Sequence, residues 1–219
     1  YSVFVNPFIG TGGHGHTFPG AVVPHGMIQP SPDTRIDGWD ACSGYYYEDS
    51  TINGFSHTHV SGTGCCDYGD VLLMPTVGEQ RYQTTDPQSQ QLAYSSAFSH
   101  ENETAEPGYY SVFLDTYQVK AEISATKRGA IHRYTFPESS EAGFILDLDY
   151  SLQRQTNSDM GIEVISDTEI CGHKKTTYWA FDQYINFYAK FSKPFSYTLV
   201  TDSITMDNGK RLPVCKVLL

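Results

Sequence analysis

Basic residues are scarce in this sequence, and the few that are present are not clustered. Its 219 residues include 14 Lys and Arg against 25 Asp and Glu, which gives a formal net charge of −11. Residues 1–80 contain a single basic side chain, Arg35, and eight carboxylates. A protein this acidic repels a phosphate backbone. We therefore expect no nucleic-acid partner.

Long apolar segments and a disulfide framework are also missing. No stretch comes near the roughly 18 consecutive apolar residues of a transmembrane helix, so we expect no membrane span. The sequence does not open at Tyr1 with a charged segment followed by an apolar one, so a signal peptide is expected to be absent or already removed. The five cysteines, with Cys65 and Cys66 adjacent, form neither a disulfide framework nor a C-x-x-C motif.

Helical periodicity is lacking too, and short strand-like segments take its place. From about Val71 onward, segments rich in Val, Ile, Tyr, Phe and Thr alternate with turn residues such as Pro107-Gly108 and Asp207-Asn208-Gly209. This pattern predicts an all-β fold, a large antiparallel β-sandwich that occupies residues 1–219 as one domain. Strands are expected at residues 71–77, 109–114, 118–125, 131–136, 144–148, 161–165, 184–191 and 197–201.

A glycine-rich segment follows the strand-like residues 3–9. Gly10 to Gly15 satisfies the G-x-G-x-x-G spacing of dinucleotide-binding loops, which requires a helix to begin at the last glycine. Pro19 and Pro24 forbid that helix. We therefore expect a loop that brings its backbone close to something other than a nucleotide.

Histidines occur in two H-x-H pairs, His14/His16 and His57/His59. In extended chain each pair would point both imidazoles to one face, where a carboxylate such as Asp67 could complete a site for zinc or a similar metal. The surrounding segments are glycine-rich loops, so histidines that only form hydrogen bonds or pack are the other interpretation. The sequence leaves both open.

An aromatic cluster stands beside several carboxylates in residues 38–49, where Trp39 is followed by three consecutive tyrosines. A sugar offers an apolar C–H face and a rim of hydroxyls, so its site needs an aromatic platform next to planar hydrogen-bonding groups. This segment supplies both. A tryptophan that faces the core of a sandwich is the competing interpretation.

Three segments closely resemble the amino-terminal domain of family 92 glycoside hydrolases: VNPFIGTGGHGHTFPGA at 5–21, GWDACSGY at 38–45 and GFSHTHVSGTGC at 54–65. PGYYSV at 107–112 and HRYTFP at 132–137 resemble the same family. The resemblance runs in order from residue 5 to about residue 194, and so covers most of the chain.

The resemblance implies a supersandwich of the galactose-mutarotase-like type, packed on a helical (α/α)6-type domain with the active site between them. It implies an exo-acting, calcium-dependent α-mannosidase that inverts the anomeric centre and removes terminal α-mannosides, with α-1,2 linkages expected, from N-glycans or mannan. It also implies a secreted, periplasmic or cell-surface bacterial protein. Its partners would be α-mannoside glycans and the helical domain of the same polypeptide.

By the same resemblance, the catalytic acid and base and the main calcium ligands come from the helical domain, which we expect to be absent here. We therefore expect no catalytic residue and no metal ligand in this chain, and no turnover by the chain alone. A free-standing, lectin-like carbohydrate-binding module and a metal-dependent enzyme built on the paired histidines are the alternatives. The residues carried over as substrate-binding are Trp39, foremost, with Asp40, His14, His16, His57 and His59. Those expected to shape loops are Asp33, Asp37, Asp40, Asp67 and Asp70.

Overall fold

The computed structural model describes residues 2–82, 89–154, 156–205 and 211–219, and this part of the chain consists of strands and loops with a few single 3₁₀ turns. None of the described helices is long and apolar enough to cross a membrane. The 3₁₀ turns are η1 (Ser2–Phe4), η2 (Trp39–Ala41), η3 (His100–Asn102) and η4 (Leu152–Arg154). The strands are β1 (Ser31–Asp33), β2 (Thr51–Ile52), β3 (Gly54–Ser56), β4 (Leu72–Val77), β5 (Ser96–Ala97), β6 (Glu103–Glu106), β7 (Tyr109–Leu114), β8 (Val119–Ala125), β9 (Ala130–Thr135), β10 (Ala142–Asp147), β11 (Thr156–Val164), β12 (Glu169–Thr177), β13 (Gln183–Lys190), β14 (Thr198–Thr205) and β15 (Arg211–Leu218).

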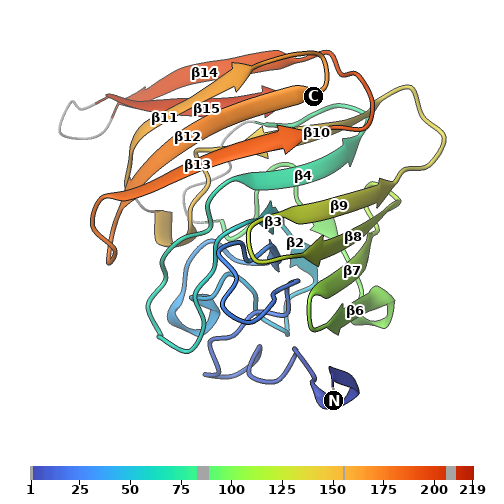
Figure 1. Ribbon diagram of the computed structural model, residues 1–219, viewed down its shortest axis with the longest axis vertical. Helices are drawn as coiled ribbons and strands as arrows, with labels where there is room; N and C mark the ends of the chain where they lie inside the picture. Colours follow the sequence, from blue (N-terminus) through green and yellow to red (C-terminus); the bar gives the residue numbers. More distant parts are fainter. Residues whose placement is uncertain (1, 83–88, 155, 206–210) are drawn as a thin grey trace.

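Three sheets stack as layers (Figure 1). The central sheet has the strand order β1-β3-β4-β10-β15-β14; the sheet β11-β12-β13 covers one of its faces and the sheet β6-β7-β8-β9 the other, while β2 pairs with β5. Every described strand pair is antiparallel. The expected all-β antiparallel sandwich is confirmed.

The central sheet is buried on both faces, and β10 shows how. Ile145 packs in a core with Tyr110 of β7, whereas the next residue, Leu146, packs on the opposite face with Ile170 of β12. Successive side chains of a strand point to opposite faces, so a strand that is covered on both sides requires a continuous apolar run. The sequence of β10 supplies that run, and the two cores meet across its backbone.

The expected strands correspond to β4, β7, β8, β9, β10, β11, β13 and β14, and β7 has the bounds predicted for it. Two long strands were not expected. In β12, Gly172 and the adjacent Lys174 and Lys175 break the apolar pattern, yet Lys174 is fully buried because its ammonium lies 3.2 Å from Asp70 Oδ1. The other is β15, which contains Pro213. The expected turn at residues 207–209 lies outside the described residues.

Residues 2–70 contain only short strands, and the strand expected at residues 3–9 is wrong. The chain forms η1 and then turns, in which the Phe8 N–H donates to Asn6 Oδ1 at 3.0 Å. The expected glycine-rich loop follows, and its backbone approaches itself: a Cβ on Gly15 would lie 2.1 Å from Gly10 O. A side chain at position 15 would therefore prevent this loop from closing.

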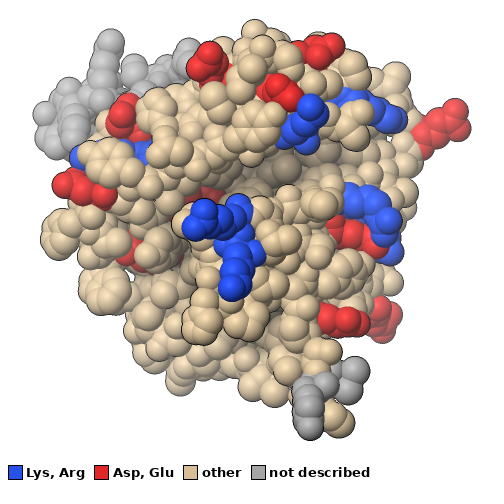
Figure 2. Space-filling view, viewed as in Figure 1, with Lys and Arg blue, Asp and Glu red and all other residues tan. Residues whose placement is uncertain are grey.

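Charged side chains of both signs are scattered over the face shown in Figure 2. The basic group near its centre lies over the turn between β8 and β9, which contains Lys127 and Arg128. The Met27 N–H donates to Lys127 O at 2.7 Å. This bond fastens the turn to the amino-terminal loops.

Candidate functional site

Trp39, the residue expected to hold a sugar, begins the short helix η2 directly after Gly38. Gly38 has φ 114°, a conformation that side chains rarely adopt, and the Cys42 N–H closes the turn onto Trp39 O at 3.4 Å. The indole points outward, with 58% of the residue exposed. Trp39 is therefore a surface residue, and the interpretation of a core-facing tryptophan is wrong.

Two histidines of the glycine-rich loop border the indole. The ring centroid of His14 lies 4.9 Å from that of Trp39, and the ring of His16 meets the indole edge-on at 4.4 Å. His14 Nδ1 also contacts Asp40 Oδ1. With Nδ1 held by the carboxylate, His14 Nε2 remains available to a ligand at an exposed position. The structure thus brings together four of the six residues predicted to bind substrate.

His16 lies beneath the indole and is held there by its backbone. It has φ 54°, its carbonyl accepts the Gly62 N–H at 2.6 Å, and only 7% of the residue is exposed. Its Nε2 is buried and has no hydrogen-bond partner in the described part of the chain. A buried polar atom without a partner is costly, so a water molecule, a ligand or a further protein group is expected to satisfy it.

Gly64 was not singled out from the sequence, yet it completes this cluster. It has φ 65°, and a Cβ there would lie 3.1 Å from Trp39 Nε1 and 3.3 Å from His16 Cε1. Only a residue without a side chain fits comfortably against both rings in this backbone conformation. The signal that could have found it is the G-x-G spacing of residues 62–64.

His59 is not part of the exposed cluster. Its side chain has no exposed surface; Nδ1 faces Gln29 O at 2.7 Å, and Nε2 faces Asp33 Oδ1 at 2.7 Å. Its ring packs on Phe18 at 4.8 Å, two residues beyond His16. His59 therefore braces the glycine-rich loop from inside and cannot touch a sugar itself, and Asp33 shapes the loop as expected.

His57 faces a third histidine rather than Trp39. Its Nε2 lies 3.3 Å from His132 Nε2 on β9, and its Nδ1 lies 2.6 Å from Val71 O. Burial is the main cause that lowers the pKa of both imidazoles; His59 lowers the pKa of His57 as well, and His57 lowers that of His132. Both ring nitrogens of His57 thus face protein groups, so the structure does not support a direct contact between His57 and a sugar. Instead, His57 joins the amino-terminal loops to the β6–β9 sheet.

Asp67 and Asp70 fasten the loop that follows Gly64 to the β12–β13 hairpin. Asp67 Oδ2 accepts the Ala180 N–H at 2.7 Å, and Asp70 Oδ2 accepts the Thr58 hydroxyl at 2.7 Å. The ammonium of Lys174 is paired with Asp70, with both side chains fully buried. The prediction that these two carboxylates shape loops is confirmed.

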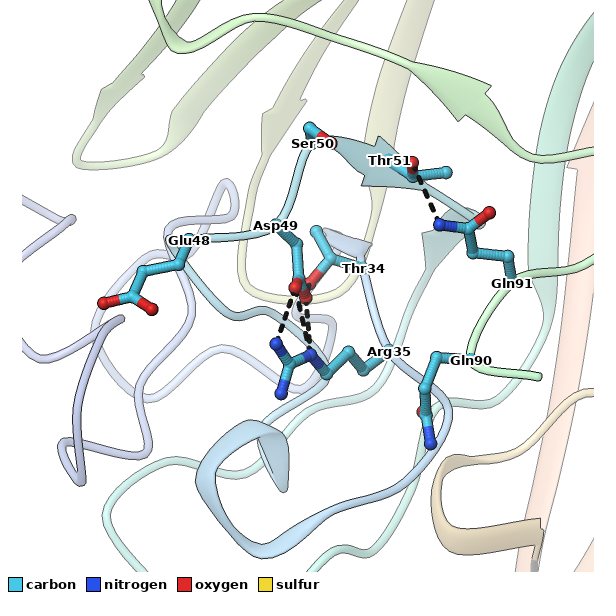
Figure 3. A pocket seen from close by; sticks show the side chains of 8 residues that line it. All are labelled: Thr34, Arg35, Glu48, Asp49, Ser50, Thr51, Gln90 and Gln91. Atoms are coloured by element: carbon cyan, nitrogen blue, oxygen red, sulfur yellow. Dashed lines mark hydrogen bonds and ion pairs between the residues drawn. The ribbon is translucent and has the colours of Figure 1, made fainter. Parts of the chain in front are cut away.

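A small polar pocket of about 150 Å³ backs the segment that leads to Trp39 (Figure 3). Arg35 makes a two-pronged contact with Asp49, at 2.9 Å from Nε and 2.8 Å from Nη2, and these hydrogen bonds raise the pKa of Arg35. Gln90 accepts the Asp37 N–H at 3.0 Å and donates to Asp37 Oδ1 at 2.6 Å. Asp37 thus shapes the Trp39 segment, as expected, and the pocket is a rigid support for it.

Within the part of the chain that the structure describes, the possible metal-ligating side chains do not gather at one point. The described residues contain no group of three or more His, Cys, Asp or Glu that could hold a metal ion. His14 and His16 contact the same indole from different angles, and His57 and His59 bind separate backbone carbonyls. Neither H-x-H pair converges, so the described residues do not fit the proposed histidine metal centre.

A β-sandwich that presents an exposed tryptophan among imidazole and carboxylate groups has the features of a carbohydrate-active domain. Comparison with known families makes this specific. The model of the glycosyl hydrolase family 92 N-terminal domain matches residues 4–213, and the chain belongs to this family. The resemblance found in the sequence is confirmed.

Two solved structures share the fold over nearly the whole chain. The family GH92 alpha-mannosidase BT3965 from Bacteroides thetaiotaomicron, in complex with mannoimidazole, is 36% identical with a TM-score of 0.89, and the match covers 100% of this chain and 30% of that chain. The family GH92 inverting mannosidase BT2199 from the same species is 27% identical with a TM-score of 0.75, covering 98% of this chain and 28% of that chain.

A curated relative, described as an uncharacterized secreted glycosidase from Arthroderma benhamiae, is 31% identical over 141 residues. That match covers 63% of this chain and 17% of the relative. The present chain therefore spans less than a third of the length of each of these three proteins.

Proposed function

We propose that this domain is the substrate-binding wall of a secreted bacterial exo-α-mannosidase, which removes terminal α-mannose, foremost α-1,2-linked, from N-glycans or mannan with inversion. The family membership and the likeness to two solved family 92 mannosidases support this proposal. The secreted description of the curated relative supports the location.

The single observation that carries the proposal is the exposed indole of Trp39 with polar groups at its edge. The apolar C–H face of a mannose would lie against the indole. His14 Nε2 and the second oxygen of Asp40 would meet its hydroxyls, while His16, whose Nε2 is buried, would support the indole from below. These contacts would hold the sugar in one orientation, which lowers the entropic barrier of the reaction.

The bond-breaking groups are proposed to come from the part of the polypeptide outside this chain. Inversion needs a general acid and a general base roughly 6.5–9.5 Å apart, with a water between the base and the sugar. Around the site, Asp33, Asp37 and Asp40 are each bonded to a neighbouring side chain and act in positioning. Calcium, which would orient and polarise sugar hydroxyls, is likewise proposed to bind residues outside this chain.

The proposal is tested by Trp39→Ala in the full-length protein. Loss of the platform should lower kcat/KM for an α-1,2-mannobioside by about 10- to 100-fold, because the indole contributes about 1.4–2.7 kcal/mol to holding the sugar in the transition state. Tyr197→Ala, which removes an exposed aromatic side chain elsewhere, is the matched control.

An unchanged kcat/KM in Trp39→Ala would remove this residue from the binding site. Residues 1–219 alone should release no more mannose than a buffer blank, with or without calcium. Mannose release that persists after repurification would contradict the proposal that the catalytic groups lie outside these residues. A full-length protein that binds mannosides but hydrolyses none would favour the lectin-like alternative instead.

A further inference from the structure

The turn between β12 and β13 exposes three aromatic side chains within four residues. Tyr178 is half-exposed, Trp179 is 64% exposed and Phe181 is 84% exposed. The backbone closes the turn, with the Tyr178 N–H donating to Ala180 O at 3.3 Å. So much aromatic surface at the tip of a hairpin marks a binding surface rather than part of a core.

The tip is fixed in place by the loop of residues 62–70. The Ala180 N–H donates to Asp67 Oδ2 at 2.7 Å, between the exposed rings of Trp179 and Phe181. Farther along the hairpin, Gln183 Nε2 donates to Asp70 Oδ2 at 2.6 Å. A surface ordered before a ligand arrives loses less conformational entropy on binding.

The same loop borders the Trp39 cluster on its other side. Cys66 Sγ lies 3.5 Å from Gly38 O, directly before Trp39, and the next residue, Asp67, holds the aromatic tip. In Figure 1 the turn between β12 and β13 lies on the same side of the view as the loop that precedes β4. The backbones that carry the two aromatic surfaces are therefore connected through one loop.

The charges around the tip favour a neutral ligand. Asp182 is paired with Lys175 at 2.8 Å, and the ammonium of Lys175 also lies 4.8 Å from the ring centre of Tyr184. The carboxylate of Asp67 is occupied by the backbone. With its nearby charges paired, the tip offers apolar rings to a ligand with apolar faces and hydroxyl groups, which describes a chain of pyranoses.

We propose that Trp179 and Phe181 form a second sugar-binding surface, which holds the uncleaved part of an oligosaccharide whose terminal residue lies at Trp39. This inference rests on the proposed function. It means that the domain binds a long oligosaccharide more tightly than a short one. A single mannose reaches only the Trp39 cluster, whereas a longer oligomannoside reaches both surfaces.

The test compares equilibrium binding of two probes to the full-length protein by titration calorimetry. The probes are methyl α-mannoside and a thio-linked α-mannotetraose that resists hydrolysis. Trp179→Ala should raise the Kd for the tetraose about fivefold more than it raises the Kd for the monosaccharide, a difference of about 1 kcal/mol in binding free energy. Phe181→Ala is the second variant, and Tyr188→Ala, an exposed tyrosine on β13 beyond the tip, is the matched control.

Equal effects on both probes, or no effect on either, would overturn the inference, while mannose release by the wild-type enzyme would leave the proposed function standing. A fall in melting temperature with unchanged affinities would also overturn it, by assigning the tip to contacts with the rest of the polypeptide. A wild-type protein that binds neither probe and releases no mannose would overturn both proposals.

Discussion

Residues 2–70 hold eight of the ten described glycines with positive φ but only the short strands β1 to β3, whereas β4 to β15 build residues 72–218. In the second region, alternating apolar side chains and backbone ladders determine the structure. In the first, contacts such as His59 with Asp33 and Cys66 with Gly38 join residues far apart in the sequence. The groups proposed to contact a sugar belong mostly to the first region.

The difference shows how a rigid sandwich supports an irregular binding surface. A regular strand can offer only alternate side chains to one face, but a loop with positive φ can bring two rings and a backbone together at one point. Trp39, His16 and Gly64 meet in this way. Such loops need internal bracing, and the buried histidines provide it.

The largest effect is expected from removing that bracing. His59→Ala would leave the carboxylate of Asp33 buried without its imidazole partner, and should lower the free energy of unfolding by about 3–5 kcal/mol. Urea unfolding followed by tryptophan fluorescence measures the change. His173→Ala, which removes a half-exposed histidine of β12, is the control. Equal stability of the two variants would mean that the loops do not depend on the buried contact between His59 and Asp33.

A smaller effect is expected where the two regions meet, at His57 and His132. Burial lowers the pKa of both, so the folded protein protonates them only at a lower pH than the unfolded chain, which binds protons near pH 6.5. Their contribution to stability is therefore present above that pH and lost as the pH falls below it. Between pH 7.5 and 5.5 the free energy of unfolding should therefore fall, because each imidazole binds its proton more readily in the unfolded chain.

Melting temperatures measured across this range test the linkage. Other groups also titrate there, so the informative quantity is the difference between the wild-type protein and His132→Gln, which removes one of the two buried imidazoles. The variant should show the shallower pH dependence. Identical slopes would show that protonation of this pair does not oppose folding.

The smallest effect is expected on the exposed face of a regular strand. Ile131→Thr on β9 should change the free energy of unfolding by less than about 0.5 kcal/mol, because the side chain is exposed and threonine suits a strand. Ile123→Thr on the neighbouring strand is the matched comparison; it places a hydroxyl in the core and should cost about 2 kcal/mol. Similar losses in the two variants would contradict the one-sided burial of this sheet.

Sequence reasoning succeeded where the physical cause of structure is local. The bounds of the strand at residues 109–114 were predicted correctly because its strand-forming residues directly follow the Pro107-Gly108 turn, so both signals are local in the sequence. It failed for β12 because the burial of Lys174 depends on Asp70, a residue more than a hundred positions earlier.

The site shows the same limit. Family resemblance identified Trp39 and its neighbours as a set, but nothing local separates His16, which lies against the indole, from His59, which lies inside the fold. That distinction arises from Gln29 and Asp33, which lie far from His59 in the sequence. The aromatic tip at Trp179 was not singled out either, because its relation to Trp39 exists only through the loop between them.

The position of β10 in the central sheet has a consequence for synthesis on the ribosome. Its partners are β4, made long before it, and β15, made well after it. Pairings between distant segments form slowly, and a nascent chain must wait for the later strand. The loops that carry Trp39 therefore emerge well before the sheet beneath them is complete, since that sheet needs β15.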